Sequence, residues 1–353
     1  MTLRLLSLHQ IRSYEFTSIE LSPSVTLILG RNGSGKTSLL EALYYLHRGT
    51  SFRGRDRDMI RYDQKVSDCK LEFVDGSERR ARLLLNDSKV IKEFIVDDKK
   101  SARLPTKNKL PVVLFEPDEL RLLTSSPSRR RQFIDGILSR LYPTYSTILA
   151  RYERTLLQRN ELLKQRERFS AEAWDSQLFA WDIRFAELAR NIVTARHDFL
   201  KLSNEHLSAI YSRLADTDHQ VTVQYSHDWS GDMLQQKLIH LLHAHRHDDA
   251  LRGYTTHGPH RDDFLISLDG HPASETASRG ELRTIMLAYK LLEVELQENV
   301  TGTRPLILMD DVFSELDIIR EKKLISELAG YQTVITATDL RDELKTKASI
   351  ISL

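Results

Sequence analysis

Gly30-Arg31-Asn32-Gly33-Ser34-Gly35-Lys36-Thr37 fits the phosphate-loop pattern G-x-x-x-x-G-K-[ST]. The apolar residues at 25–29 predict a buried strand before this loop, and the apolar spacing of residues 38–46 predicts a helix after it. An ordinary glycine-rich turn is the alternative interpretation. It is the less favoured one, because every fixed position of the pattern is filled in the strand–loop–helix context that phosphate binding requires. We therefore expect residues 30–37 to bind a nucleotide.

Each fixed position of the loop has a chemical reason. The glycines allow a tight turn whose N–H groups point at phosphate oxygens, at the positive end of a helix. Lys36 would neutralise the β- and γ-phosphate oxygens. The hydroxyl of Thr37 would bind Mg²⁺, a cation that takes few protein ligands and otherwise keeps phosphate oxygens and water. The loop therefore predicts a nucleotide held together with Mg²⁺.

Two carboxylates follow an apolar stretch near the other end of the chain. Residues 305–309 predict a buried strand, and Asp310 and Asp311 come directly after it. In a parallel sheet such a strand places its acids at the same edge as the phosphate loop. Asp310 would then hold Mg²⁺, and Asp311 would orient or deprotonate the attacking water.

A polar helix start lies between these two motifs. Ser278 and Glu281 fit the capping box S-x-x-E at the beginning of an apolar-periodic helix, which alone accounts for both residues. A second interpretation is that Ser278 and the amide of Gly280 form another phosphate cradle, which binds γ-phosphate when a second copy of the chain docks on it. The two interpretations are compatible, since a capped helix end is what such a cradle uses.

The charges are unevenly distributed along the chain. The formal net charge is +1, but residues 1–150 hold 26 Lys and Arg against 18 Asp and Glu, and residues 151–353 hold 25 against 32. Basic residues of the first part form three clusters: Arg48, Arg53, Arg55, Arg57 and Arg61; Lys99, Lys100, Arg103, Lys107 and Lys109; and Arg129, Arg130 and Arg131. Such clusters would suit a nucleic-acid backbone. A solvated face with interspersed acids is the alternative.

Composition points to an intracellular compartment. The single cysteine, Cys69, excludes an intramolecular disulfide and a cysteine-based zinc site. No apolar run reaches the roughly 18 residues of a membrane-spanning helix, and the first residues show no signal-peptide pattern. We therefore expect a cytoplasmic protein without a membrane partner.

Four histidines near the end of the middle region have helical spacing: His240, His243, His245 and His247. No carboxylate or cysteine pattern completes a metal site with them, so we expect surface histidines.

Taken in order, these motifs resemble the head ATPases of the ABC class. The phosphate loop, the S-x-G-[QE] helix start, the strand ending in two aspartates and the turn at 314–317 follow in that class's order. The whole chain resembles the RecF family, compact relatives of the structural-maintenance-of-chromosomes heads. Further stretches that carry this resemblance are Ile11-Arg12-Ser13-Tyr14, Ser51-Phe52-Arg53, Pro117-Asp118-Glu119-Leu120, residues 129–135, and residues 256–263, Thr-His-Gly-Pro-His-Arg-Asp-Asp.

The resemblance implies the roles of several residues. Ser278 and Gly280 would belong to a signature motif that acts in trans, so that ATP and Mg²⁺ lie between two copies of the chain. Asp311 would stand where other ABC proteins carry a catalytic Glu, and residues 314–317 would be the D-loop. Glu281 departs from the family's usual Gln and adds a negative charge near the γ-phosphate site. Either Thr336 or Thr338 would sense the γ-phosphate.

The resemblance also implies a biological role. ATP-driven dimerisation would assemble a DNA-binding surface on duplex, gapped or junctional DNA, and slow, DNA-stimulated ATP hydrolysis would release it. Together with RecR and RecO, such a protein would help load RecA onto single-stranded DNA in recombinational repair and replication-fork maintenance.

These observations predict an α/β fold, an ABC-type P-loop ATPase head with mixed β-sheets and an inserted helical arm lobe. The head would comprise residues 1–124 plus 251–353, with a mixed sheet begun by the hairpin-like segments around residues 3–29 and 68–96. The lobe would comprise residues 125–250, where apolar steps of three or four residues, broken at 169–171, predict an antiparallel helical pair.

Two other functions use the same nucleotide chemistry. An ABC transport motor is disfavoured because residues 334–339 contain no switch histidine and because transporters lack the stretch at 256–263. A nucleotide-gated scaffold, in which turnover is incidental, is favoured only by Asp311 being shorter than Glu.

Overall fold

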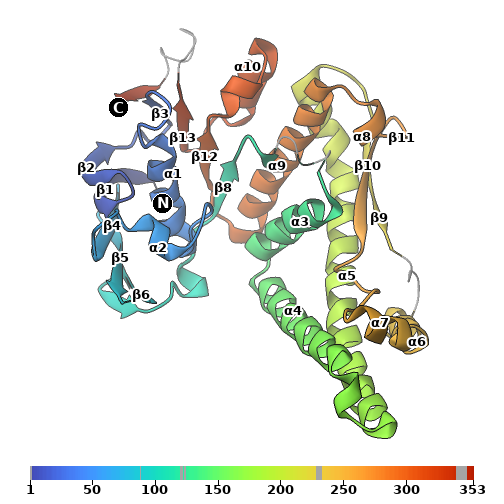
Figure 1. Cartoon of the computed structure of the whole chain (residues 1–353). Coiled ribbons are helices and arrows are strands. Elements are labelled where there is room, and N and C mark those ends of the chain that lie inside the picture. The colour runs from blue at the N-terminus through green and yellow to red at the C-terminus, as the bar shows by residue number, and fades with distance from the viewer. Residues whose placement is uncertain (1, 88, 120–121, 123–124, 228–232, 339–347) are drawn as a thin grey trace. The chain divides into compact units, whose positions relative to one another are not determined.

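The computed structural model describes all residues except 1, 88, 120–121, 123–124, 228–232 and 339–347 (Figure 1). It divides into two compact units, which we describe separately. The first unit comprises Met1–Leu120 and Glu293–Leu353, and the second comprises Arg121–Leu292. Among the helices of the described residues, none combines the length and the apolarity that crossing a membrane requires.

The first unit contains an antiparallel sheet of six strands in the order β2-β1-β4-β5-β6-β7. Its strands are β1 (Leu3–Ile11), β2 (Tyr14–Glu20), β4 (Val66–Phe73), β5 (Glu78–Asn86), β6 (Lys89–Val96) and β7 (Lys99–Ser101). Buried and more exposed residues alternate along β4, as expected of a strand with one face on the core and one toward water. The buried face carries Cys69, Leu71 and Phe73, and the other face carries charged residues in ion pairs such as Arg80–Asp68.

A separate parallel sheet of five strands has the order β14-β3-β13-β12-β8. Its strands are β3 (Val25–Leu29), β8 (Val112–Phe115), β12 (Leu306–Asp310), β13 (Thr333–Ala337) and β14 (Ser349–Ser352). β13 lies between β3 and β12, with Ala337 opposite Leu29 and Thr336 opposite Asp310. The carboxyl ends of β3 and β12 are therefore one strand apart at the same edge of the sheet.

Parallel and antiparallel pairing are thus separated into different sheets of the described chain. The expected hairpin segment around residues 3–29 is split between them, since β1 and β2 join the antiparallel sheet whereas β3 joins the parallel one. The expected segment around residues 68–96 lies wholly in the antiparallel sheet. Both segments form strands as expected, but not in one mixed sheet.

Helix α1 (Lys36–Arg48) packs against strands of both sheets, and its apolar face fills the core between them. The other helical segments of this unit are α2 (Asp56–Met59), the 3₁₀ turns η1 (Thr106–Asn108) and η4 (Val312–Glu315), and α10 (Ile318–Glu327). His47, near the end of α1, is only 2% exposed. Its Nδ1 donates to the carbonyl of Leu43 at 2.7 Å, since a carbonyl can only accept. Burial lowers the pKa of His47 to about 3, so the ring is neutral in the fold.

The second unit is mostly helical, with one small sheet. Its helices are α3 (Pro127–Leu141), α4 (Pro143–Lys164), the 3₁₀ turn η3 (Arg166–Arg168), α5 (Ala171–Ala215), α6 (Leu234–Ala244), α7 (Arg246–Arg252), α8 (Ala273–Thr276) and most of α9 (Arg279–Thr301). The long helices α4 and α5 pack along each other, and the chain breaks between them at Phe169 and Ser170, as the sequence predicts. Ser170 caps α5 by accepting from the N–H of Ala173.

The second unit ends further along the chain than expected, because it includes a three-stranded sheet. Strand β9 (Val221–Ser226) pairs with β10 (Asp263–Leu268), which pairs with β11 (His271–Pro272). The β9–β10 ladder spans six residue pairs and ties residues beyond 250 to the helical part. The second unit therefore extends to Leu292, whereas the expected lobe ended at residue 250.

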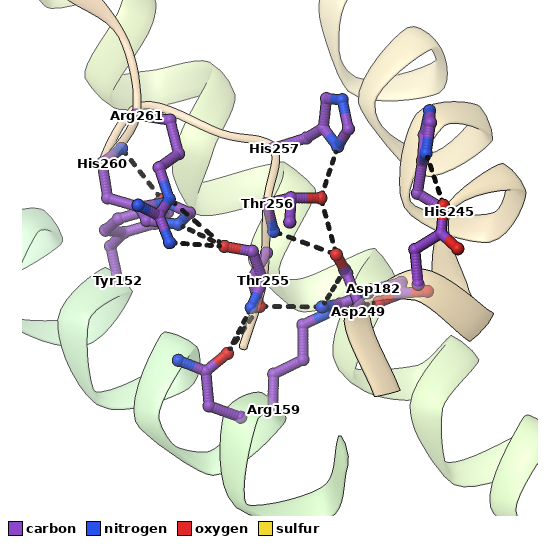
Figure 2. A network of polar contacts seen from close by, with 12 residues as sticks. Tyr152, Arg159, Asp182, His245, Asp249, Thr255, Thr256, His257, His260 and Arg261 are labelled. Atoms are coloured by element: carbon purple, nitrogen blue, oxygen red, sulfur yellow. Dashed lines mark hydrogen bonds and ion pairs between the residues drawn. The ribbon is translucent and has the colours of Figure 1, made fainter. Parts of the chain in front are cut away.

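A buried ion cluster holds the segment at 255–257 to the helices of the second unit, and Figure 2 shows its members. Arg159 is fully buried; its Nε donates to Asp182 Oδ1 at 2.7 Å and its Nη1 to Asp249 Oδ2 at 2.9 Å. Asp249 Oδ1 in turn accepts from the backbone N–H and the hydroxyl of Thr256. Thr255 receives a further hydrogen bond from Arg159 Nη1 at 2.7 Å. One guanidinium thus pairs with two buried carboxylates, and the cluster fixes the start of the stretch at 256–263. Since one positive charge cannot neutralise two negative ones, burial and the nearby Asp249 raise the pKa of Asp182.

Replacing Arg159 by Met should lower the free energy of unfolding by about 3–5 kcal/mol, because Asp182 and Asp249 would stay buried without their cation. Chemical denaturation with a probe in the second unit measures this. The control is Arg80→Met, which breaks a half-exposed pair with Asp68 and should cost less than about 1 kcal/mol. Equal losses in the two variants would contradict the assignment of Arg159 as a structural centre.

His47 gives a prediction about pH. The unfolded chain binds a proton at this ring below about pH 6.5, whereas the folded chain does so only near pH 3, so stability is lost as pH falls through this range. Between these two pKa values, His47 alone lowers the free energy of unfolding by up to about 1.4 kcal/mol for each pH unit of acidification. His47→Gln should have a shallower slope of unfolding free energy between pH 6 and 4 than the wild type, whatever its absolute stability. Parallel slopes would show that the buried ring does not act this way.

Candidate nucleotide-binding site

A cleft of about 1130 Å³ opens in the first unit beside the carboxyl edge of the parallel sheet. Five phosphate-loop residues line it: Asn32, Gly33, Gly35, Lys36 and Thr37. Asp310 and Asp311 line it from the end of β12. The structure thus places the phosphate loop and the two aspartates in one cleft, as expected from the order of the motifs. Gly30, Arg31 and Ser34, the other residues of the loop, are not among the lining residues.

The phosphate loop has the backbone that its glycines allow. Gly33 and Gly35 have φ of 83° and 98°, in the left-handed region that disfavours side chains. At Gly35 a Cβ would also lie 2.8 Å from both the Ser13 hydroxyl and the Tyr14 hydroxyl, because the turn between β1 and β2 packs directly on the loop. Gly35 is therefore required both for its conformation and for its close approach to that turn.

Lys36 begins α1 and is only 7% exposed. Its Nζ donates to the carbonyls of Gly30 at 2.7 Å and Arg31 at 3.1 Å, so the ammonium group lies within the curve of its own loop. This arrangement holds a cation at the N-terminal end of α1, where the helix dipole also favours an anion.

A hydroxyl and a carboxylate meet across the sheet edge. Thr37 Oγ1 donates to Asp310 Oδ1 at 2.9 Å, and Thr336 Oγ1 lies 2.9 Å from the same oxygen. Thr336 is fully buried in β13. A hydroxyl and a carboxylate oxygen are hard ligands of the kind that Mg²⁺ prefers, so Thr37 and Asp310 fit a magnesium ion. The hydrogen bond from the buried Thr336 hydroxyl holds the Asp310 carboxylate in its orientation.

Asp311 lies beside this pair with an unusual backbone. Its φ is +50°, and its N–H donates to both the carbonyl and the hydroxyl of Thr336 at 3.1 Å. The hydroxyl of Ser314 donates to the Asp311 carbonyl at 2.7 Å. Burial raises the pKa of the Asp311 carboxyl above its ordinary value, although the charge of Lys36 opposes the shift. A carboxylate with a raised pKa is better suited to accept a proton.

The signature segment belongs to the second unit. Ser278 N–H donates to Glu281 Oε2 at 2.7 Å, and Glu281 N–H donates to Ser278 Oγ at 3.3 Å. This reciprocal pair is the capping box that the sequence predicts at the start of α9. Ser278 is exposed and Gly280 partly exposed. The role of these two residues as a phosphate cradle for a second copy stays a prediction.

The structure places members of the basic clusters in different surroundings. Arg53, Arg57 and Arg61 line the cleft together with Arg12 and Lys65, and the expected contact of these clusters with nucleic acid stays a prediction. In the second unit, Arg130 forms a bidentate pair with Asp263, and Arg131 donates to the Asp262 carbonyl at 2.7 Å. The structure therefore commits Arg130 and Arg131 to contacts within their own unit.

The sequence analysis did not identify Glu41, whose ion pair joins α1 to the turn between β1 and β2. Glu41 in α1 is fully buried and forms a bidentate ion pair with Arg12. A carboxylate among the apolar residues of a helix that follows a phosphate loop is the signal that could have identified it, because a buried charge needs a partner. Its partner lies 29 residues away, beyond any local pattern.

Comparison with known proteins supports the same fold and family. The model of a family described as an AAA domain matches residues 5–224. The DNA replication and repair protein RecF of Lachnoclostridium phytofermentans is 33% identical over 347 residues, covering 97% of this chain and 94% of the relative. The protein of that name from Acetivibrio thermocellus is 33% identical over 343 residues, covering 94% and 92%.

Solved structures agree with these relatives. A structure of the recombination mediator protein RecF-ATP in the RecFOR pathway matches with a TM-score of 0.84 and 29% identity over 97% of this chain and 93% of that one. An Smc head domain from Pyrococcus furiosus, at 18% identity, matches over 99% and 93% with a TM-score of 0.52 and supports the fold alone. The expected fold class, an ABC-type ATPase head, is confirmed. On the evidence of its near-complete similarity to these relatives, the chain belongs to the RecF family of DNA replication and repair proteins.

Proposed function

We propose that this chain is an ATP-dependent DNA-binding protein of recombinational repair and replication-fork maintenance. The observation that carries the proposal is the cleft in which Lys36 and Thr37 of the phosphate loop lie beside Asp310 and Asp311. The names of the relatives and the RecF-ATP structure support it.

The phosphate loop binds the triphosphate of ATP. Its backbone N–H groups and the start of α1 offer donors to phosphate oxygens, and Lys36 exchanges its contacts with the Gly30 and Arg31 carbonyls for the β- and γ-phosphates. Residues 30–37 thus all belong to the site, some by lining it and some by shaping the loop.

Thr37 and Asp310 hold Mg²⁺ beside the phosphates. The ion would supply charge neutralisation for phosphoryl transfer. Thr336 keeps the Asp310 carboxylate in place through its buried hydroxyl. Because Thr336 is committed to this contact, the exposed Thr338, directly after β13, is the better candidate for sensing the γ-phosphate.

Asp311 acts on the attacking water. Its raised pKa suits a group that accepts a proton, and the left-handed backbone held by Thr336 and Ser314 sets the direction of its side chain. Aspartate is one methylene shorter than glutamate, which agrees with slow hydrolysis that serves as a switch.

A second copy of the chain completes the site. Ser278 and Gly280 of one copy approach the γ-phosphate bound by the other, and the turn at 314–317 lines the contact. Glu281 occupies the Ser278 N–H through the capping box, so its charge opposes the incoming phosphate. The dimer nevertheless forms with ATP, because groups of both copies contact the γ-phosphate, and it loosens when hydrolysis removes that contact.

The dimer binds DNA that is duplex, gapped or at a junction between single and double strands. DNA stimulates the weak ATPase, and RecR, with RecO, couples the bound protein to RecA loading on single strands in the cytoplasm. Basic residues of the chain contact the DNA phosphates, so the affinity for DNA falls steeply with salt as counterions are released.

Lys36→Met removes the cation of the loop, so ATP binding should weaken by at least about tenfold, and the ATP-dependent dimer and its DNA binding should be lost with it. Titration calorimetry measures ATP binding, sedimentation measures the dimer, and anisotropy of a labelled gapped duplex measures DNA binding from about 50 to 200 mM salt. The control is Lys201→Met, which removes an exposed lysine of α5 in the second unit.

The outcomes separate the candidate functions. Loss of all three activities in Lys36→Met alone supports ATP-clamped DNA binding. A wild-type dimer that forms with ATP but does not bind DNA favours a nucleotide-gated scaffold. DNA binding that is the same at both salt concentrations contradicts recognition of the phosphate backbone.

Thr336→Val keeps the shape of the side chain but removes its hydrogen bond to Asp310. Hydrolysis with Mg²⁺ should fall by about 10–100-fold, as for other residues that orient a metal ligand, whereas ATP binding without Mg²⁺ should be unchanged. Steady-state phosphate release and calorimetry in EDTA measure the two. Thr333→Val, at the far end of the same strand, is the control. Equal hydrolysis by both variants would contradict the role of Thr336.

A further inference from the structure

Two segments that frame the cleft meet at one buried carboxylate, and a third segment is bound to the first of them. Glu41 is fully buried in α1, about one and a half turns after Lys36. Its Oε2 accepts from Arg12 Nε at 2.8 Å and its Oε1 from Arg12 Nη2 at 2.7 Å. Oε1 also accepts from the hydroxyl of Ser51 at 2.5 Å. Both oxygens of Glu41 are therefore engaged, and its charge is balanced by a single guanidinium.

The first of these segments is the turn between β1 and β2, which carries Arg12. Arg12 has a left-handed backbone with φ of 51°, and its N–H donates to the Met59 carbonyl at 2.9 Å. The next residues, Ser13 and Tyr14, pack directly on Gly35 of the phosphate loop. The hydrogen bond to Glu41 raises the pKa of Arg12, so this cation stays charged in its partly buried place.

The second segment is the turn after α1, which carries Arg53. The Ser51 hydroxyl donates to Glu41 and accepts from the N–H groups of Arg53 and Gly54, at 3.0 and 3.1 Å. The Ser51 hydroxyl thus links the Glu41 carboxylate to the backbone of the turn by hydrogen bonds. The third segment, at 59–61, is bound to the first through the Arg12 contact and through Arg61 N–H, which donates to the Gln10 carbonyl at 2.9 Å.

Cations on these segments, together with Arg57 in α2 just before the third, line the cleft. Arg12, Arg53, Arg57 and Arg61 all border it, on the same cleft as Lys36. Arg61 reaches Glu15 only at 3.4 Å, and among the described residues no ion pair involves the guanidinium groups of Arg53 or Arg57. Arg53 and Arg57 therefore favour a polyanion in the cleft, which Asp58 and Asp63 also border, and fixing these cations in advance reduces the entropy lost on binding.

We infer that Glu41 is a positioning residue for the nucleotide, an inference that rests on the proposed ATP site. Through Arg12 and Ser51, its carboxylate fixes the arginine-bearing segments at 12, 51–54 and 59–61, which we call the rim of the cleft, to the helix that begins at the phosphate loop. Glu41 does not touch the nucleotide. It acts by joining the rim and the loop into one rigid frame, so that phosphates held by the loop meet arginines already in place.

The test is a double-mutant cycle on ATP affinity. Glu41→Gln keeps the size of the side chain and removes its charge, so Arg12 loses its bidentate partner; the Kd for ATP with Mg²⁺ should rise about tenfold. Arg12→Ala should weaken binding by a similar factor. If Glu41 acts through Arg12, the double variant should bind no more weakly than Arg12→Ala alone, because the two changes interrupt the same connection.

A purely structural role of Glu41 would give a different result. The two changes would then add, and the loss of affinity would follow the loss of thermal stability, which is measured on the same samples. Asp68→Asn is the matched control, since it removes an ion-paired carboxylate from the same unit outside the cleft and should leave the Kd unchanged. If Glu41→Gln does not fold, Ser51→Ala decides the matter, because it releases only the turn at 51–54 and should raise the Kd about threefold.

The results also separate this inference from the proposed function. A wild type that does not bind ATP overturns both. A wild type that binds ATP, with Glu41→Gln and Ser51→Ala binding equally well, overturns the role of Glu41 and leaves the ATP site standing. Additive losses in the cycle likewise overturn it.

Discussion

The hydrogen bond from Thr37 to Asp310 joins residues that are 273 positions apart, and the cleft depends on it. It is possible because β3 and β12 run parallel with only β13 between them, so their carboxyl ends meet at one edge. Thr336 lies on β13; its hydroxyl donates a hydrogen bond to Asp310 and accepts one from the N–H of Asp311. One sheet edge thereby sets the positions of the phosphate loop, the candidate metal ligands Thr37 and Asp310, and the candidate base Asp311.

Buried charges organise both units in the same way. Glu41 pairs with Arg12 in the first unit, and Arg159 pairs with both Asp182 and Asp249 in the second. In each case the charged group reaches segments that are distant in sequence and fixes a turn without regular structure. Breaking a buried ion pair costs much more than breaking an exposed one, so such pairs hold the turns that they reach in place.

Features that depend on neighbouring residues could be predicted from the sequence. The phosphate loop follows from its spacing, the strand before Asp310 from its apolar run, and the contacts of Ser278 with Glu281 from a four-residue pattern. Features that depend on distant pairing could not. The β9–β10 ladder joins segments some 40 residues apart and moved the boundary of the second unit, and Arg12 and Arg53 could be counted as basic residues but not placed in the cleft.

The central claim is that the cleft of the first unit holds ATP together with Mg²⁺. The most direct measurement is calorimetric titration of the full chain with ATP, first with Mg²⁺ and then with EDTA in its place. We expect one ATP per chain with Mg²⁺ and clearly weaker binding in EDTA, because Thr37 and Asp310 then lose the ion that links them to the phosphates. No binding, or the same affinity in both solutions, would contradict the claim.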